Sequence, residues 1–472
     1  MSLGLIHELA SEEGGIFVSG LNGILDVARR ALSAQRAGID VTSHNVANAS
    51  TPGYTRQRLN LQATSPTKET FGYLGSGVAA SGVQRIRQAF IDQQIRNTNH
   101  YLSKSAEQES VLSQIEAAFN EPSDAGLGSM INGFFNSFQD LSLHPEDSSF
   151  RNSLVQRATA MNDGFHRITA SFDQLKSDLI LDAQSKVDQV NTLVREIYET
   201  GQRITSLEAG GLDANDIRDI QDLKIDELSK LANIKVSDDG QGGTLITLGN
   251  VFMESRAGFS TLQAGVVGTQ LQITVAGSST VADIAGGELG GILETRNVLI
   301  PGYQAKLDSL VSSIITRTNA VHSAGYGIGT PPPTGNNFFV GIDGRSINVN
   351  PAIVSNLNLI AASGDGAPGN NTVALSLAGV SDEKLLNGGS ETIPQNYSSL
   401  VSDIGATIQS VSNASKSQDL VLKQLENQRS AISGVSIDEE MVALIKFQNG
   451  FDAAAKVITT VNQMYQSLLN MV

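Results

Sequence analysis

The segment IDEEMVALIKFQNGFDAAAKVITTVNQMYQSLLNMV, residues 437–472, has the strongest periodicity in the chain. One set of positions recurs in alternating steps of four and three residues, which predicts a long helix that packs along a seam. These positions are Ile437, Met441, Leu444, Gln448, Phe451, Ala455, Ile458, Asn462, Tyr465, Leu469 and Val472. A second apolar stripe runs beside them, at Val457, Val461, Met464, Leu468 and Met471. Two apolar faces indicate that this helix has neighbours on more than one side.

The beginning of the chain shows the same periodicity. The positions in step are Leu21, Leu25, Ala28, Leu32, Gln35, Ile39, Thr42 and Val46. Two interpretations stay open for these paired ends. They form an interface with other molecules, or they are a helix pair that folds back on the protein's own core.

The segment TSHNVANASTPGYTRQR, residues 42–58, joins the first helix to the rest of the chain. Asn45 and Asn48 compete for backbone hydrogen bonds near the helix end, and Thr51-Pro52-Gly53 predicts a turn in which Pro52 fixes φ. Tyr54 follows as an aromatic anchor, and Arg56 and Arg58 present guanidinium groups at alternate positions. We expect a rigid elbow at this point.

The interior changes from helical periodicity to strand periodicity and back. Helical spacing covers 83–120, then 165–197 with a slip of phase, and it breaks at Gly210-Gly211. Short alternating runs with Gly and Asp turns predict hairpins from about 236 to 275. Helical spacing returns at 298–322 and again at 401–432, where it ends at Gly434.

These patterns predict an α+β multidomain fold with both termini together. We expect a terminal coiled-coil domain from residues 1–75 plus 434–472. A long-helix bundle domain is expected from 76–235 plus 291–433, with a β-rich segment near 335–393. A small β-rich outer domain is expected at 236–290.

Composition excludes several kinds of chemistry. The 472 residues include no Cys, which rules out disulfides and thiolate sites, and 48 acidic against 32 basic residues give a net charge of −16. That charge argues against a chain-wide nucleic-acid or anionic-lipid surface, and no apolar run is long enough to span a membrane. The six His residues lie far apart, and no nucleotide-binding or hydrolase motif occurs. Acidic pairs such as Asp238-Asp239 and Glu439-Glu440 are interpreted as solvated turns and helix caps. We predict no catalytic residues, no metal site and no cofactor.

Both ends resemble the bacterial flagellar axial family of rod, hook and hook-associated proteins. The N-terminal match falls on Asn45, Ala47, Asn48, Thr51, Pro52, Gly53 and Tyr54. The C-terminal match falls on Ser436, Glu440, Met441, Leu444, Gln448 and 454–458. Interior stretches such as DLKIDELSKLANIKV and LGGILETRNVLIPGYQAKL are similar to the members that join hook to filament. The chain is short for those members, which implies a reduced outer domain.

The resemblance implies a structural subunit, not an enzyme, located outside the cell at the hook–filament junction. It implies export by the flagellar type III system without a cleaved signal. The implied partners are further copies in a helical array, hook protein, hook-associated protein 3 and an export chaperone, with no nucleic acid and no membrane insertion. The assembly residues that it implies are Asn45, Asn48, Thr51, Pro52, Gly53, Tyr54, Met441, Leu444, Phe451, Ile458, Tyr465 and Leu469. The alternatives are another axial component, namely hook-associated protein 3 or hook protein, or an axial scaffold with an enzymatic or adhesive outer domain.

Overall fold

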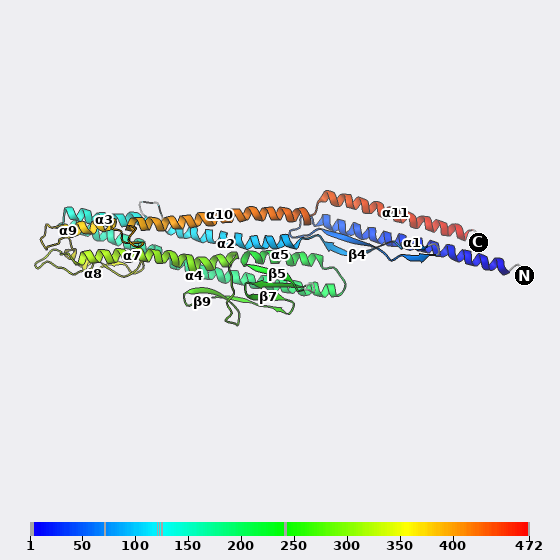
Figure 1. The fold of residues 1–472 in the computed structure, drawn as a ribbon, viewed down its shortest axis with the longest axis horizontal. Helices are drawn as coiled ribbons and strands as arrows, with labels where there is room; N and C mark the ends of the chain where they lie inside the picture. Colours follow the sequence, from blue (N-terminus) through cyan, green and yellow to red (C-terminus); the bar gives the residue numbers. More distant parts are fainter. Residues whose placement is uncertain are drawn as a thin grey trace.

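The computed structural model describes residues 4–69, 72–119, 121, 123, 126–239 and 243–470. The molecule is a long rod with both termini at one end (Figure 1). That end holds helices α1 (Gly4–Ala47) and α11 (Ile437–Leu469), which run antiparallel and pack against each other. The α+β multidomain fold class predicted from the sequence is confirmed.

Two small hairpins accompany the terminal helices. Strand β1 (Gln57–Ala63) pairs antiparallel with β4 (Val78–Arg85), and both strands pack on α1. Strand β2 (Thr67–Glu69) pairs with β3 (Gly72–Leu74) between them. Since Val83 lies in β4, helix α2 begins only at Ala89, later than the helical spacing from 83 had predicted.

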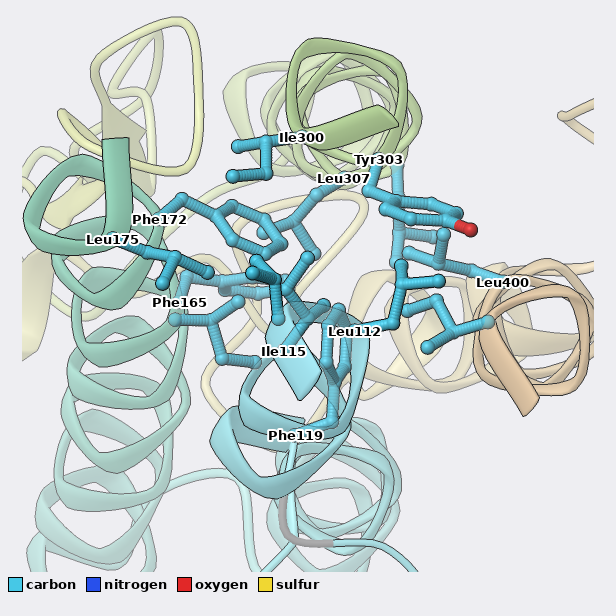
Figure 2. Packing of buried hydrophobic residues seen from close by; sticks show 14 of the residues in the cluster. Leu112, Ile115, Phe119, Phe165, Phe172, Leu175, Ile300, Tyr303, Leu307 and Leu400 are labelled. Atoms are coloured by element: carbon cyan, nitrogen blue, oxygen red, sulfur yellow. The ribbon is translucent and has the colours of Figure 1, made fainter. Parts of the chain in front are cut away.

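Four long helices build the middle of the rod. They are α2 (Ala89–Phe119), α4 (Ser148–Ala209), α7 (Ile300–Ser323) and α10 (Ile393–Ser433). Figure 2 shows their shared core, in which Ile115 of α2, Phe172 of α4, Leu307 of α7 and Leu400 of α10 meet. Helix α6 (Gly287–Glu294) and a π-helical turn (Thr295–Leu299) lead directly into α7.

The ends of these helices follow local signals. Asp147 caps α4, because its carboxylate accepts a hydrogen bond from the Ser149 N–H, and Thr392 with Gln395 forms a capping box on α10. Buried Ala183 lies between the two apolar series of α4, so the predicted slip of phase occurs within one continuous helix. The predicted ends at Gly210-Gly211 and Gly434 are confirmed.

Helix α5 (Asn215–Leu231) and two β-sheets lie along one side of α4. Strands β5 (Ile234–Asp238), β6 (Thr244–Leu248), β7 (Val251–Ser255) and β8 (Gly258–Phe259) form one antiparallel sheet. Strands β9 (Leu262–Val267) and β10 (Gln270–Val275) form a separate hairpin. Glu254 of β7 is only 3% exposed, and its Oε2 has no hydrogen-bond partner among the described residues. Burial, together with the charge of Asp239, raises the pKa of Glu254 to about 7.

The far end of the rod differs from the predicted β-rich segment at 335–393. It contains only two strands of two residues each, β11 (Phe339–Val340) and β12 (Asn348–Val349), within its otherwise irregular or helical chain. The helices there are α3 (Leu127–Leu143), α8 (Pro351–Ser355) and α9 (Thr372–Gly379). The longest apolar run of this segment, at 372–378, forms helix α9, and glycine and asparagine turns separate the other runs into short pieces. Phe338 and Phe339 pack on Phe134 of α3 instead.

Candidate functional site

The paired terminal helices meet along one continuous seam. Leu21, Ala28 and Ala34 of α1 and Ala454 and Val461 of α11 are buried, and α1 packs against α11 on one side and against β1 and β4 on another. Near the outer end, the Tyr465 hydroxyl donates to Asn22 Oδ1 at 2.6 Å. The seam is therefore apolar in the middle and closed by a hydrogen bond toward the termini.

The two helices are tightly packed at Gly38. A Cβ built on Gly38 would lie 2.6 Å from the ring of Phe447, a separation that no carbon pair tolerates. The aromatic ring therefore occupies the space that a side chain at position 38 would fill. This contact fixes how α11 is placed along α1.

Asn45, at the end of α1, connects three segments through its amide. The side chain is 1% exposed. Its Oδ1 accepts hydrogen bonds from the Tyr54 hydroxyl at 2.8 Å and from the Gln57 N–H at 3.0 Å. Its Nδ2 donates to Gln57 O at 2.8 Å and to Glu440 Oε2 at 2.9 Å. Asn45 therefore holds the elbow, the first strand and the start of α11 together.

Glu440 is the second centre of this arrangement. It lies in the first turn of α11, is 3% exposed, and its Oε1 accepts from Arg56 Nε at 2.7 Å. A second nitrogen of the same guanidinium donates to Glu439 at 2.7 Å. The interpretation of Glu439-Glu440 as a solvated cap is therefore wrong for Glu440, because the elbow covers its carboxylate.

The elbow itself has the predicted turn geometry. Gly53 has φ of +79°, a conformation that favours glycine, and the chain reverses so that the Tyr54 N–H donates to Thr51 O at 3.2 Å. Burial, followed by the charges of Asp216, Asp219 and Glu440, raises the pKa of Tyr54. Its hydroxyl therefore stays protonated and keeps its role as a donor to Asn45.

The elbow also contacts α5 of the long-helix body. The Thr55 N–H donates to Asp219 Oδ2 at 2.9 Å, and Gln57 Nε2 donates to Asp216 Oδ1 at 2.7 Å. Through these contacts the terminal helices are tied to residues more than 150 positions later in the chain.

A network of arginines and aspartates lies where the terminal hairpin joins the long helices. We call it the joint cluster. It consists of Arg85, Arg87, Asp92, Arg96, Asp219, Asp222, Asp226 and Arg429. Asp222 is its centre: it accepts from Arg85 at 2.9 Å, from Arg96 at 3.1 Å and also from Arg87.

The charges of the joint cluster are largely withdrawn from solvent. The Asp222 side chain is 22% exposed, and those of Arg85 and Arg87 are 16% exposed. Burial alone would raise the pKa of Asp222, but the adjacent guanidinium groups hold it below its ordinary value. The carboxylate therefore remains ionised and links β4, α2 and α5 at neutral pH.

The predicted assembly residues fall into three groups in the structure. Asn45 and Tyr54 lie in the elbow contacts, beside half-buried Asn48, whose Nδ2 donates to His44 O. Leu444, Phe451, Ile458 and Tyr465 are half-buried in the α1–α11 seam. Thr51, Pro52, Gly53, Met441 and Leu469 are exposed in the single chain.

Several residues of this site were absent from the predicted set. Arg56 and Glu440 pair across 384 positions of sequence, and the joint cluster brings together three distant segments, 85–96, 219–226 and Arg429. The only signal in the sequence was that Arg56 and Arg58 follow the turn at alternate positions, and a paired guanidinium cannot be told from a solvated one by sequence alone. The sequence also does not say which carboxylate pairs with Arg56.

Among the described residues, no group of acidic or histidine side chains is arranged to hold a metal ion. Within the same residues, no helix is both long and apolar enough to cross a membrane.

Comparison with known proteins identifies the family. A flagellar hook-associated protein 1 of Bacillus subtilis (strain 168) is 30% identical over 495 residues, which cover 94% of this chain and 97% of that protein. The chain belongs to the flagellar hook-associated protein 1 family. The description "Flagellar hook-associated protein FlgK helical domain" matches residues 112–339. Two rod-protein families also match. "Flagella basal body rod protein" matches residues 25–55, and "Flagellar basal body rod FlgEFG protein C-terminal" matches residues 426–471.

Two further matches agree with this family. Flagellar hook-associated protein 1 of Escherichia coli (strain K12) is 25% identical over 556 aligned residues, covering 95% of this chain and all of that protein. That alignment is longer than the chain's 472 residues, so this relative carries segments that the chain lacks. The hook junction protein FlgK from Burkholderia pseudomallei has the same fold, with a TM-score of 0.62 at 15% identity, over 72% of this chain and all of that one.

Membership of the hook-associated protein 1 family confirms the predicted resemblance and a structural role in the flagellum. The two rod-protein matches cover residues 25–47 of α1 with the elbow as far as Thr55, and α11 with the end of α10. Asn45, Tyr54 and Glu440 therefore lie within the rod-protein matches, whereas Arg56 and, apart from Arg429, the joint cluster lie outside them.

Proposed function

We propose that this chain is the non-enzymatic subunit that joins the flagellar hook to the filament, and that it assembles through its terminal helices. The observation that carries the proposal is an apolar face of α11 that no described part of the chain covers. Ile437, Met441, Val442 and Ile445 on this face are 55%, 45%, 69% and 52% exposed. Such a face on a helix that is already packed on one side is typical of a protein–protein interface.

The proposal extends to partners and location. Copies of the chain form a helical array, because a head-to-tail contact repeated without closure gives an open tube. Hook protein borders the array on one side and hook-associated protein 3 on the other. An export chaperone holds the chain before it passes through the flagellar type III system without a cleaved signal. The names of the relatives and the rod-protein matches at both ends support this assignment.

The proposed assembly residues are the twelve predicted from the family motif, in two roles. Asn45, Asn48 and Tyr54 shape the elbow, whereas Leu444, Phe451, Ile458 and Tyr465 hold the helix pair. The exposed members, Thr51, Pro52, Gly53, Met441 and Leu469, are proposed to contact neighbouring subunits.

Electron microscopy of a strain that lacks this chain tests the proposal. We expect hooks of normal length without attached filaments. A strain without hooks would identify hook protein instead, and a strain with normal filaments would refute the proposal. In the complemented strain, Ile445→Asp should reduce the fraction of hooks with filaments, because it places a charge on the uncovered face. Gln463→Asp, at an exposed polar position of the same helix, is the matched control and should not.

A further inference from the structure

The β2–β3 hairpin extends the β1–β4 ribbon at the end where Ala63 pairs with Val78. In β3, Tyr73 is 74% exposed and Leu74 is 55% exposed. Lys68, which pairs with Tyr73 across the hairpin, is exposed as well. A two-stranded hairpin is only marginally stable by itself in water, and exposed aromatic rings are enriched at protein interfaces. The hairpin is therefore a candidate contact surface with an apolar part and a cation.

The uncovered face of α11 combines apolar side chains with carboxylates. Val442 and Ile445 are 69% and 52% exposed. They follow Asp438 at helical spacing, and Asp452 continues the same stripe, so the four residues share one face of the helix. Neither Asp438 nor Asp452 forms an ion pair with another described residue. Both carboxylates are therefore available to a partner.

The hairpin side and the α11 side of the terminal helices carry opposite charges. From Ile437 to Asp452, α11 has four carboxylates and one cation, and Arg56 adds one cation that pairs with two of them. From Leu21 to Gln84, with Arg56 set aside, five cations stand against three carboxylates. These cations are Arg29, Arg30, Arg36, Arg58 and Lys68, and the carboxylates are Asp26, Asp40 and Glu69. All five cations are exposed and none forms an ion pair with a described residue, so their charge favours an acidic partner surface.

The hairpin does not reach the uncovered face of α11 in its own chain. Figure 1 shows α1 between α11 and the ribbon, and α1 packs against both. Phe447 packs on Gly38, so Val442 lies level with about residue 43 of the antiparallel α1. Gly77, at the base of the hairpin, packs on Val27. At about 1.5 Å per residue the two levels are about 24 Å apart, so the two surfaces can meet only between different copies.

We propose that the β2–β3 hairpin of one copy packs on the uncovered face of α11 of the next copy in the array. Tyr73 and Leu74 supply the apolar contact with Val442 and Ile445, and the exposed cations of the first copy face the carboxylates of the second. The inference rests on the proposed function, because it requires that copies be neighbours. Because the contact joins two different surfaces, it repeats head to tail and builds an open array.

Paired cysteines in isolated hook–basal bodies test the proposal. The chain contains no Cys, so Tyr73→Cys and Val442→Cys introduce its only thiols. After treatment with a short bismaleimide, the double variant should give products of two and more times the 49.8 kDa subunit mass, and neither single variant should. Phe252→Cys with Val442→Cys is the control and should stay monomeric, because Phe252 is 66% exposed but lies on the β5–β8 sheet. Leu74→Cys with Ile445→Cys tests the same contact at neighbouring positions. Monomer alone from both contact pairs, or a dimer from a single variant, would overturn the proposal.

Charge exchange supplies the second arm. Lys68→Glu should lower the yield of the crosslinked dimer about threefold, because it places a carboxylate against the acidic face. Adding Asp438→Lys to that variant should restore the yield. Lys416→Glu, at an exposed position of α10, should leave the original yield unchanged. A yield that Lys68→Glu does not lower, or that Asp438→Lys does not restore, would also contradict the proposal. If filaments attach normally without this chain, the proposed function fails. If they detach but neither cysteine pair crosslinks, only the present inference fails.

Discussion

Replacing Asp222 by Asn tests whether the joint cluster holds the long-helix body to the terminal hairpin. In the wild type the carboxylate accepts hydrogen bonds from Arg85, Arg87 and Arg96. The amide introduced by Asp222→Asn is nearly isosteric with the carboxylate, but it carries no charge and turns an NH₂ group toward the cations. The substitution therefore removes the central anion without creating a cavity.

The size of the effect follows from the contacts. A hydrogen bond between charged groups contributes about 1.5–3 kcal/mol, but each of the three arginines keeps a second carboxylate, so only part of the sum is lost. The side chain of Asp222 is 22% exposed, and water compensates for a further part. We expect the free energy of unfolding to fall by about 2–4 kcal/mol at neutral pH.

Urea unfolding followed by circular dichroism measures this loss, and hydrogen exchange at 89–96 and 215–226 localises it. Asp403→Asn is the matched control: Asp403 pairs with Lys306 at 2.6 Å, but their side chains are 48% and 54% exposed. It should change the free energy by less than about 0.5 kcal/mol. Equal losses in the two variants would refute the reasoning.

The pH dependence provides an independent check. The pKa of Asp222 is held below its ordinary value. Its contribution to stability is therefore complete above about pH 4 and is lost as the pH falls through the folded-state pKa. The difference between wild type and Asp222→Asn should consequently narrow in acid. A difference that stays constant down to about pH 2.5 would show that charge is not the cause.

Three further predictions concern other parts of the chain. Asn45→Asp removes two amide donors and places a second carboxylate beside Glu440. Thermal unfolding should show that the free energy of unfolding falls by about 2–4 kcal/mol, and this difference from wild type should shrink in acid, where a carboxylate is protonated. Gly38→Leu forces the ring of Phe447 away, and hydrogen exchange should show weaker protection along α11, whereas an unchanged pattern would mean that the helices do not depend on this contact. The pKa of Glu254 is raised to about 7, so the neutral carboxyl stabilises the fold and this contribution is lost as the pH rises through 7. The melting temperature of wild type should therefore fall between about pH 5 and 8, and that of Glu254→Gln should fall less over the same range.

The sequence predicted features that depend on local signals. The ends of α4 and α10 follow from glycines, and the turn at Gly53 follows from a Pro-Gly pair. It did not predict the joint cluster, because Arg85 and Asp219 are 134 positions apart, and Arg429 and Asp226 are 203 apart. Ion pairs at such separations are chosen by the tertiary fold, and each charged residue alone is indistinguishable from a solvated one.

The structure shows which residues of α11 face α1 and which do not, a distinction that the heptad pattern of the sequence did not make. Of the positions in the predicted heptad, 444, 451, 455, 458 and 465 are half-buried, whereas 448, 462 and 469 are exposed. The residues at 447, 454, 461 and 468, which the heptad did not include, are buried or half-buried. A heptad repeat permits a step of three or of four residues after each seam position. Apolar spacing alone therefore could not tell whether 448, 455, 462 and 469 or 447, 454, 461 and 468 face α1. In the phase that the structure adopts, Met441, Ile437 and Ile445 lie outside the seam and are about half-exposed. One face of α11 is therefore covered by α1, whereas its other apolar face, which includes Ile437, Met441 and Ile445, is covered by none of the described residues and is the face through which we propose that subunits assemble.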